Sequence, residues 1–286
     1  MHFYGKSSEI ALAPNPVYAG HSAGYTESPL VDHTVGSVHT GLSLNQLEAE
    51  GFLAPHLHSY EEGFYILEGN AEVTVKGRTR RLGPGDFGAL KVETLHAWSN
   101  RGDTPVRWLQ MAAPQPKPFG KERDTFFAKD ANVPSASGPL DLNDLAGDLL
   151  GHFDVSQIPP VGERPAGPVG PGVFLRWLID EQFGARHHRM LFLEYQPGAS
   201  IGLHDHTFEE GYFLLSGEVE ATLDGKMYHA KPGDVLWTGV GCVHSFKNVG
   251  ATPVRWLETF SPQPPAENVF RFMAEWEQKA NELEKG

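Results

Sequence analysis

The sequence predicts an all-β protein made of two tandem domains, each an antiparallel sandwich or barrel, followed by a C-terminal α-helix. Three observations carry this prediction: an internal repeat, short strand segments that end at glycine turns, and an amphipathic last segment. The repeat is the strongest of the three. Residues Leu30–Pro116 recur as Leu178–Pro264, displaced by 148 positions with no insertion. A duplication of this length indicates two copies of one domain.

The most apolar segment of each half predicts a β-strand. Gly63–Glu68 (GFYILE) and its copy Gly211–Ser216 (GYFLLS) are rich in aromatic and branched residues, which favour strands. The sequence Pro-Gly-Asp at 84–86 recurs at 232–234 and predicts a turn in each half. Short strands at regular spacing between Gly and Pro residues are typical of antiparallel sandwiches and barrels.

The two domains are predicted to span residues 1–128 and 173–286, because a Pro/Gly-rich linker lies between them at 129–172. This linker contains one possible helical turn, Leu142–Leu150. The last segment, Ala266–Lys285, predicts a helix whose apolar residues recur at spacings of three and four, namely Val269, Met273, Trp276, Ala280 and Leu283. We expect this helix to pack on its own domain or on a partner subunit, and we expect the protein to be a homo-oligomer.

Composition excludes several classes of partner. A formal charge of −13 at pH 7 argues against nucleic-acid binding, because phosphate recognition needs clustered Lys and Arg. Cys242 is the one cysteine, which excludes an intramolecular disulfide framework. The sequence shows no signal peptide near Met1 and no run of about 18 apolar residues that could cross a membrane. We therefore expect a cytoplasmic protein with a small-molecule substrate.

Both halves carry the same pattern of metal-ligating residues. The pattern is three histidines and one glutamate: His56, His58, Glu62 and His96 in the first half, and His204, His206, Glu210 and His244 in the second. Alternate side chains of a strand share a face, so the His-x-His pair, and the Glu if the strand is continuous, should point into one barrel interior. The last histidine must come from another strand.

This donor set indicates a catalytic metal site in each half. Neutral imidazoles and a carboxylate suit a divalent transition metal such as manganese, iron, nickel, cobalt or zinc. A six-coordinate ion held by three or four protein ligands keeps open positions for water, substrate or dioxygen. Two metal sites are therefore predicted.

These residues resemble the motifs of the cupin superfamily, and specifically those of the two-domain bicupins. The first family motif, G-x5-HxH-x3-E-x6-G, matches His56–Gly69 and His204–Gly217 apart from its leading Gly. The second, G-D-x4-P-x-G-x2-H-x3-N, matches Gly85–Asn100 and Gly233–Asn248 in part. The resemblance implies a double-stranded β-helix, or jelly roll, in each half, with the metal inside the barrel.

The chain departs from the second motif at two positions. The motif's Pro is Lys91 in the first copy and Gly239 in the second, and its internal Gly is kept as Gly241 but replaced by Glu93 in the first copy. Such a Gly often relieves a tight turn. The replacement puts the loop geometry of the first copy in doubt, so we expect the second copy to be the main catalytic site.

Residues around the quartets receive more ordinary predictions. The alternation predicts aromatic and aliphatic residues that line the interiors, namely Tyr60, Phe64 and Ile66 in the first half and Phe208, Tyr212 and Leu214 in the second, with Trp98 and Phe246 near the last histidines. The glutamates before the ligands, Glu61 and Glu209, should point outward. Arg107 and Arg255 are predicted to form structural ion pairs, and Cys242 is not expected to be a ligand.

The resemblance implies a metal-dependent enzyme, most simply a dioxygenase like the quercetinase-like cupins. An apolar, partly aromatic pocket favours a hydroxylated, enolic or aromatic substrate over a small dianion such as oxalate. Glu210, or Glu62 in the first half, would then serve as ligand and as base for the substrate proton. The alternative is a non-redox metalloenzyme, namely a hydrolase like ureidoglycine aminohydrolase, a decarboxylase or an isomerase. A storage or ligand-binding bicupin is the third hypothesis.

Overall fold

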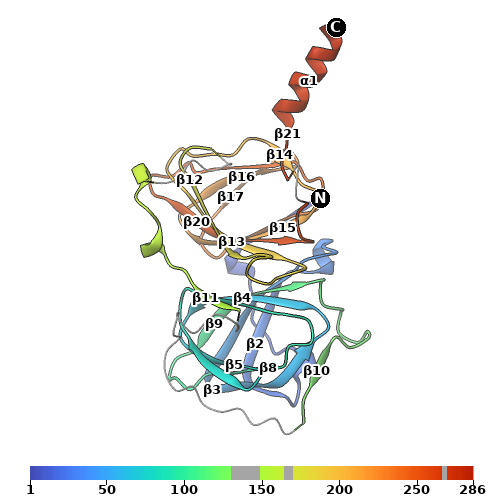
Figure 1. Cartoon of the computed structure of the whole chain (residues 1–286), viewed down its shortest axis with the longest axis vertical. Coiled ribbons are helices and arrows are strands. Elements are labelled where there is room, and N and C mark those ends of the chain that lie inside the picture. The colour runs from blue at the N-terminus through green and yellow to red at the C-terminus, as the bar shows by residue number, and fades with distance from the viewer. Residues whose placement is uncertain (130–148, 164–169, 266–268, 286) are drawn as a thin grey trace.

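The computed structural model describes residues 1–129, 149–163, 170–265 and 269–285. Two β-barrels lie one above the other, and the C-terminal helix extends from the second (Figure 1). This confirms the predicted all-β fold with a jelly roll in each half. The possible helical turn at Leu142–Leu150 falls almost entirely outside the described residues, and the domain boundaries stay a prediction.

In the first barrel, the two faces of the jelly roll are joined into one continuous hydrogen-bonded sheet. The sheet is continuous because β3 bends through both faces: residues 41–47 pair with β9, and residues 52–56 pair with β8. The strands are β2 (Ser22–Val31), β3 (Gly41–His58), β4 (Glu61–Glu68), β5 (Ala71–Val75), β6 (Arg78–Leu82), β7 (Asp86–Leu90), β8 (His96–Ser99), β9 (Val106–Ala113) and β10 (Thr125–Phe127).

In the second barrel, the corresponding strands form two separate sheets, one of six strands and one of five. The counterpart of β3 is interrupted here at Pro197-Gly198, where Pro cannot donate a ladder hydrogen bond. The strands are β12 (Val173–Ile179), β13 (Arg189–Tyr195), β14 (His204–Asp205), β15 (Glu209–Ser216), β16 (Val219–Leu223), β17 (Lys226–Ala230), β18 (Val235–Thr238), β19 (His244–Lys247), β20 (Val254–Ser261) and β21 (Arg271–Phe272).

The two repeats exchange a strand. The first strand of the chain, β1 (His2–Gly5), pairs with β18 of the second barrel. Its counterpart 148 positions later, β11 (Leu150–His152), pairs with β7 of the first barrel. The exchanged strands bond the same acidic position, since Tyr4 donates to Asp234 and His152 contacts Asp86, each at 2.7 Å. The sheet of each barrel therefore includes a strand from the other repeat.

Two buried carboxylates also cross the interface, since each accepts hydrogen bonds from the other half of the chain. Glu209 accepts hydrogen bonds from the Ser37 hydroxyl at 2.6 Å and from the backbone N–H groups of residues 38–40 at 2.9 to 3.1 Å. Glu61 accepts from the backbone N–H groups of Arg186 and His187 and lies 2.7 Å from His188 Nδ1. Both carboxylates point out of their own barrels, as predicted, but they are buried against the other barrel.

Three apolar cores hold this arrangement together. One fills the first barrel and one fills the second. The third lies between the barrels and combines residues of both halves, among them Leu42, Leu109, Ile179, Phe192 and Trp237. Because burial of apolar area is the dominant favourable term in folding, this shared core makes the two halves one folded body.

The C-terminal helix is shorter than predicted and does not pack on its own domain. The helix α1 spans Met273–Lys285, and none of its residues is buried. Val269, predicted to lie on its apolar face, lies outside the helix, two residues before β21. Pairing of β21 with β14 competes with helix formation here, which explains the later start. No helix in the described part of the chain is long and apolar enough to span a membrane.

We predict that Glu209→Ala lowers the free energy of unfolding by about 3 kcal/mol, because several buried donors of residues 37–40 lose their acceptor. Glu218→Ala, on the exposed side of the same barrel and beside Lys231, is the matched control and should change it by less than about 0.5 kcal/mol. Denaturant unfolding measures both. Equal effects of the two substitutions would contradict a stabilising role of the exchanged carboxylate.

Candidate metal centre

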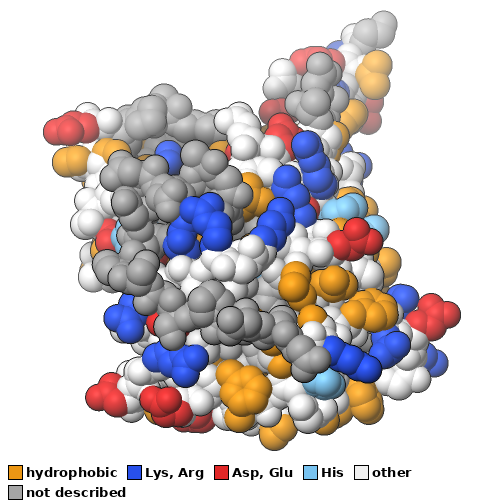
Figure 2. Space-filling view, turned by 60° about the horizontal axis from the view of Figure 1, so that its bottom comes forward, with side chains coloured by type: hydrophobic (Ala, Val, Ile, Leu, Met, Phe, Trp, Pro, Cys, Tyr) orange, Lys and Arg blue, Asp and Glu red, His pale blue; other side chains and the backbone are white. Residues whose placement is uncertain are grey.

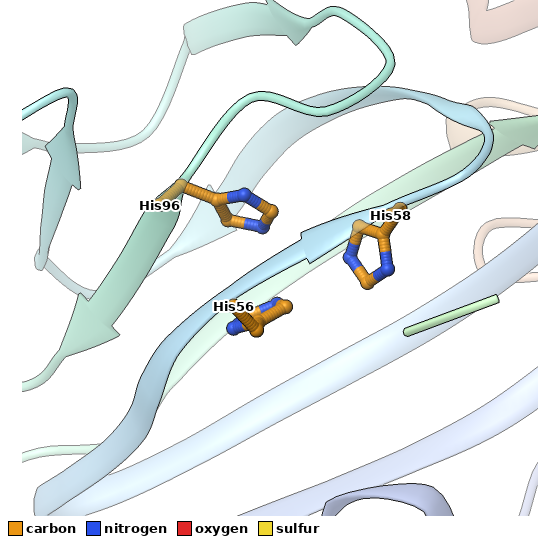
Figure 3. A group of neighbouring side chains, drawn as sticks. All are labelled: His56, His58 and His96. Atoms are coloured by element: carbon orange, nitrogen blue, oxygen red, sulfur yellow. The ribbon is translucent and has the colours of Figure 1, made fainter. Parts of the chain in front are cut away.

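The histidines of the first quartet meet at the end of one strand. His56 and His58 lie on β3, and His96 begins β8 directly opposite His56. All three side chains are buried, and their ligand atoms lie within 4.8 Å of one another. Figure 3 shows the three rings close together around a common space. Strand pairing therefore joins two histidines that are distant in the sequence.

The second quartet repeats this arrangement in the other barrel. His204 on β14 pairs with His244 on β19, and His206 follows two residues after His204. Their ligand atoms also lie within 4.8 Å of one another, and all three are buried. The two triads are thus equivalent in backbone position as well as in sequence.

Each carboxylate reaches its histidines from a neighbouring strand. The continuous strand that the sequence allowed is absent, because β3 ends at His58 and β4 begins at Glu61 after a bend. Glu62 Oε2 still lies 3.2 Å from His58 Nε2 and 3.6 Å from His96 Nε2. In the second barrel, Glu210 lies 3.2 Å from His206 and 3.1 Å from His244. All eight predicted ligands are therefore brought together in two groups of four.

Every imidazole is oriented through its Nδ1 atom. Five of these atoms lie 2.6 to 2.9 Å from a backbone carbonyl, and that of His58 lies 3.0 Å from the Thr125 hydroxyl; the carbonyls belong to Ala54, Thr94, Gly202, Cys242 and Val269. Such partners fix the ring and leave Nε2 as the lone-pair donor, as in metal-binding histidines.

Orphaned polar atoms in the first quartet support a metal. Nε2 of His58, Nε2 of His96 and Oε1 of Glu62 are buried and have no hydrogen-bond partner, which is costly unless a ligand satisfies them. Burial lowers the pKa of His56, His58 and His96 to about 3, so the rings are neutral donors at neutral pH. The donor set fits a divalent transition metal, and its binding stays a prediction for both quartets.

The two carboxylates differ in their hydrogen bonds. The hydroxyls of Tyr212 and Thr238 donate to Glu210 Oε2, whereas the corresponding residues in the first barrel, Phe64 and Leu90, have no hydroxyl. Burial alone would raise the pKa of Glu210, but the neighbouring His206 and His244 and the Tyr212 hydroxyl hold it below the usual range. Burial raises the pKa of Glu62. The ionised form is therefore favoured more strongly for Glu210 than for Glu62.

A cavity of about 310 Å³ opens onto the second quartet and includes all four of its members in its wall. The remaining wall is apolar and aromatic apart from Tyr195, Tyr212 and Glu258; it consists of Val173, Phe174, Leu175, Trp177, Leu191, Leu193, Ile201, Phe246, Phe260, Val269 and Phe270. None of these lining residues is a Lys or Arg. The second site can accept a carbon-rich molecule of moderate size.

Aromatic rings pack against the histidines of the first quartet. Tyr18 packs edge-on against His56 with ring centroids 5.5 Å apart, and Tyr60 stacks on His58 at 4.3 Å. Phe127 packs against both Tyr18 and His56. A cavity of about 330 Å³ lies beside Tyr18 and Tyr60, but its lining does not include the three histidines. Among the cavities described, the one of about 310 Å³ reaches its quartet and the one beside Tyr18 and Tyr60 does not.

The loop before His96 does not differ in the way the sequence suggested. Glu93 adopts φ +66°, close to the +72° of Gly241. The backbone N–H of Glu93 donates to His58, and that of Gly241 donates to His206. Glu93 thus tolerates a left-handed conformation that costs a non-Gly residue about 1 kcal/mol. The preference for the second copy rests on its cavity and not on this turn.

Sequence reasoning missed Glu258 and the segment before the helix. Glu258 lies on β20 in the cavity wall, and Trp256 Nε1 donates to its Oε2 at 2.8 Å. Burial and the charge of Glu210 raise its pKa well above the usual range. Its counterpart is Gln110, so a comparison of the halves at interior positions would have singled it out. Nothing in the sequence placed Val269 or Phe270 beside the quartet.

The other predictions have mixed outcomes. Tyr212 and Phe246 line the cavity, while Phe208, Leu214, Phe64, Ile66 and Trp98 belong to the barrel cores. Arg107 and Arg255 form the predicted ion pairs, with Glu68 at 3.8 Å and Glu194 at 2.7 Å. Cys242 is buried, and its sulfur groups with His2 and Asp224 rather than with the quartet.

Comparison with known proteins finds a cupin domain in each half of the chain. A family model described as "Cupin domain" matches residues 45–111 and 191–260. An oxalate-binding protein of Thermotoga maritima is 44% identical over 62 residues, which are 21% of this chain and 51% of that protein. The chain thus spans about half the length of this curated relative. The family model covers both quartets, whereas the match to the oxalate-binding protein covers 62 residues. Neither match identifies a substrate for this chain.

Solved structures of two enzymes superimpose on most of the chain. An oxalate decarboxylase of Lactobacillus farciminis, in a formate complex, superimposes with a TM-score of 0.67 and 17% identity over 96% of this chain and 89% of that one. A mutant of salicylate 1,2-dioxygenase from Pseudoaminobacter salicylatoxidans superimposes with a TM-score of 0.62 and 15% identity over 79% and 71%. At these identities the likeness concerns the fold.

We predict that a chelator removes metal in two phases. Metal in the second quartet should leave at least about tenfold faster, because the first quartet can exchange only after local opening around Tyr18. The metal that remains after timed exposure to EDTA is measured by mass spectrometry. His204→Ala should remove the fast phase and His56→Ala the slow one. A fast phase that survives His204→Ala would contradict this assignment.

Proposed function

This chain is a two-domain member of the cupin superfamily, and we propose that it is a metal-dependent dioxygenase that acts in its second barrel. The proposed substrate has an apolar, aromatic or otherwise carbon-rich skeleton with a hydroxyl or enol group. The wall of the second cavity is the observation that carries this proposal. It combines a four-residue metal-ligand set with eleven apolar or aromatic side chains.

The cavity suits such a substrate better than a small dianion. Its volume of about 310 Å³ lies at the lower end of the range for small-molecule sites. A dicarboxylate that enters it would lose its hydration without an Arg or Lys in the lining to replace it, and burial of an unpaired charge costs several kcal/mol. Apolar rings gain free energy in the same place, at roughly 25 cal/mol per Å² buried.

The residues His204, His206, Glu210 and His244 would hold the metal. When bound, a divalent transition metal supplies a Lewis-acidic centre with open positions for a substrate oxygen and for dioxygen. Phe270 and His204 have ring centroids 5.3 Å apart, and Phe246 and His244 are 5.9 Å apart. These aromatic rings exclude water from the side of the histidines that faces the cavity.

Two carboxyl groups are available to handle the substrate proton. Glu210 is kept ionised by its neighbours and can accept the proton of the substrate hydroxyl, with Tyr212 holding the carboxylate in place. Glu258 keeps its proton because its pKa is raised by burial and by the charge of Glu210. Groups whose surroundings separate their pKa values are typical of acid and base pairs. We assign base to Glu210 and acid to Glu258.

The proposed reaction needs no external reductant. The substrate hydroxyl loses its proton to Glu210, a carbon–carbon bond of the substrate breaks, and both atoms of dioxygen enter the products. The proton is returned to the product by Glu258, and Glu258 is reprotonated when Glu210 releases its proton. Atoms and electrons therefore balance with substrate and dioxygen alone.

A non-redox reaction is the alternative, and the likeness to an oxalate-binding protein and to an oxalate decarboxylase favours it. In that reaction the metal acts as a Lewis acid and dioxygen is not consumed. The two functions differ in their requirement for air, so a single experiment separates them.

We predict that oxygen uptake accompanies loss of a hydroxylated aromatic or enolic substrate. Metal-loaded protein is screened in an oxygen electrode with flavonols, hydroxybenzoates and β-diketones, and with oxalate as the comparator. His244→Ala should reduce turnover at least about a thousandfold, since it removes a ligand, whereas His96→Ala in the closed first site should change it only a few-fold. Turnover of any of these compounds at an equal rate without oxygen would refute the dioxygenase.

Glu258→Gln tests the acid role separately. General acids contribute about 10²- to 10⁴-fold, so kcat should fall at least about a hundredfold while KM changes little. Because the pKa of Glu258 is raised, its proton is present below that pKa and lost above it; wild-type activity should therefore fall as pH rises through it. The variant should lack this basic limb. A variant that retains the wild-type pH profile would show that Glu258 only shapes the cavity.

A further inference from the structure

The C-terminal helix α1 leaves apolar side chains in solvent. Trp276 is 56% exposed and Leu283 is 84% exposed. Figures 1 and 2 both show the helix extending away from the second barrel. Together with Met273 and Ala280, these residues form one stripe along the helix, which we call the helix stripe.

A helix of this kind is not stable by itself. It has 13 residues, and isolated helices shorter than about 12 to 15 residues are marginal in water even when rich in alanine. Most helical stability in proteins comes from packing of an apolar face. A surface that covers the helix stripe is therefore required, and the described part of this chain does not supply it.

The spacing of the stripe identifies the covering surface. Met273, Trp276, Ala280 and Leu283 follow one another at intervals of three, four and three, which are the a and d positions of two heptads. A helix with this pattern is complementary to a copy of itself. We infer that a second copy of this chain covers the helix stripe, with the two helices packed in parallel about a two-fold axis.

Charge selects the parallel orientation. In this register Lys279 occupies a g position and Glu284 the following e position, so a parallel pair places Lys279 of one protomer beside Glu284 of the other, twice. An antiparallel pair would place the two Lys279 side chains opposite each other. Lys279 already lies along the edge of the stripe, because its Nζ sits 4.6 Å from the centre of the Trp276 ring.

Other coverings suit the helix less well. Its polar residues are mainly acidic, namely Glu275, Glu277, Glu282 and Glu284 against Lys279 and Lys285, whereas helices that lie on membranes carry mostly Lys and Arg. An exposed apolar residue of the barrel also lies at the start of the helix, since the Met273 backbone N–H donates to the carbonyl of Leu203, which is 45% exposed. In the inferred dimer, Leu203 is therefore positioned to extend the interface onto the second barrel.

Dimer formation would affect the wall of the second cavity, because the helix is joined to a segment of that wall. The helix follows directly after β21, and Val269, two residues before β21, accepts the hydrogen bond from His206 Nδ1 at 2.6 Å. Phe270 lies in the cavity wall. Helix pairing anchors the far end of this segment, so the segment that orients a metal ligand is held from both sides in the dimer.

Sedimentation velocity of the full chain over a concentration series tests the inference. Wild type should dimerise, and Leu283→Asp should raise the dimer Kd at least about tenfold, because it places a charge at an apolar d position of the helix pair. Glu282→Lys, at an outward position of the same helix, is the control and should leave Kd within about twofold. The melting temperature of the barrels verifies that each variant is folded.

A charge exchange distinguishes pairing with a second copy from any other covering. Lys279→Glu and Glu284→Lys should each weaken self-association, and a mixture of the two variants should restore it, because both cross pairs then become attractive. Ala280→Cys should form an interchain disulfide on mild oxidation, since equal a positions meet only in a parallel pair. A wild-type chain that stays monomeric, a dimer unaffected by Leu283→Asp, or a mixture no tighter than its components would each overturn the inference.

Discussion

The arrangement depends on two carboxylates that leave their own barrel and are buried against the other. Glu61 and Glu209 each accept backbone hydrogen bonds from the opposite half, and each immediately precedes a quartet glutamate. Because successive residues of a strand face opposite sides, anchoring Glu209 to the neighbouring barrel fixes the direction in which Glu210 enters its own. The interface between the halves and the two candidate metal centres are therefore set by adjacent residues, and an error at one would displace the other.

The two halves share the same strand arrangement but differ in the side chains around the quartets. In the first barrel Tyr18, Tyr60 and Phe127 pack against the histidines. Phe64 and Leu90, which have no hydroxyl, stand there in place of Tyr212 and Thr238. The second barrel keeps an apolar cavity beside the ligands and surrounds Glu210 with Tyr212 and Thr238. The same four candidate ligand positions thus lie against packed aromatic rings in one half and beside a cavity in the other. Differences at the residues around the ligands, rather than at the ligands, separate their roles.

The sequence was sufficient for the repeat, the fold and the composition of both quartets, since these depend on residue identity at a fixed offset. It was insufficient where position depends on contacts between distant segments. Nothing local reveals that β1 and β11 exchange, that Val269 leaves the helix to orient His206, or that Glu258 faces the cavity. The turn at Glu93 shows the converse: a residue expected to disturb the loop adopts the left-handed conformation, because its backbone hydrogen bond to His58 compensates.

The exchange of β1 and β11 means that the repeat is not the unit of folding. A single repeat produced alone would lack the edge strand that its partner donates and would expose unpaired backbone groups there. A second identical molecule could supply that strand, so the two-repeat chain is the covalent form of a strand-swapped dimer. Cleavage between the repeats would accordingly yield complementing fragments that recover structure by associating, and a gene for one repeat would encode half of a fold.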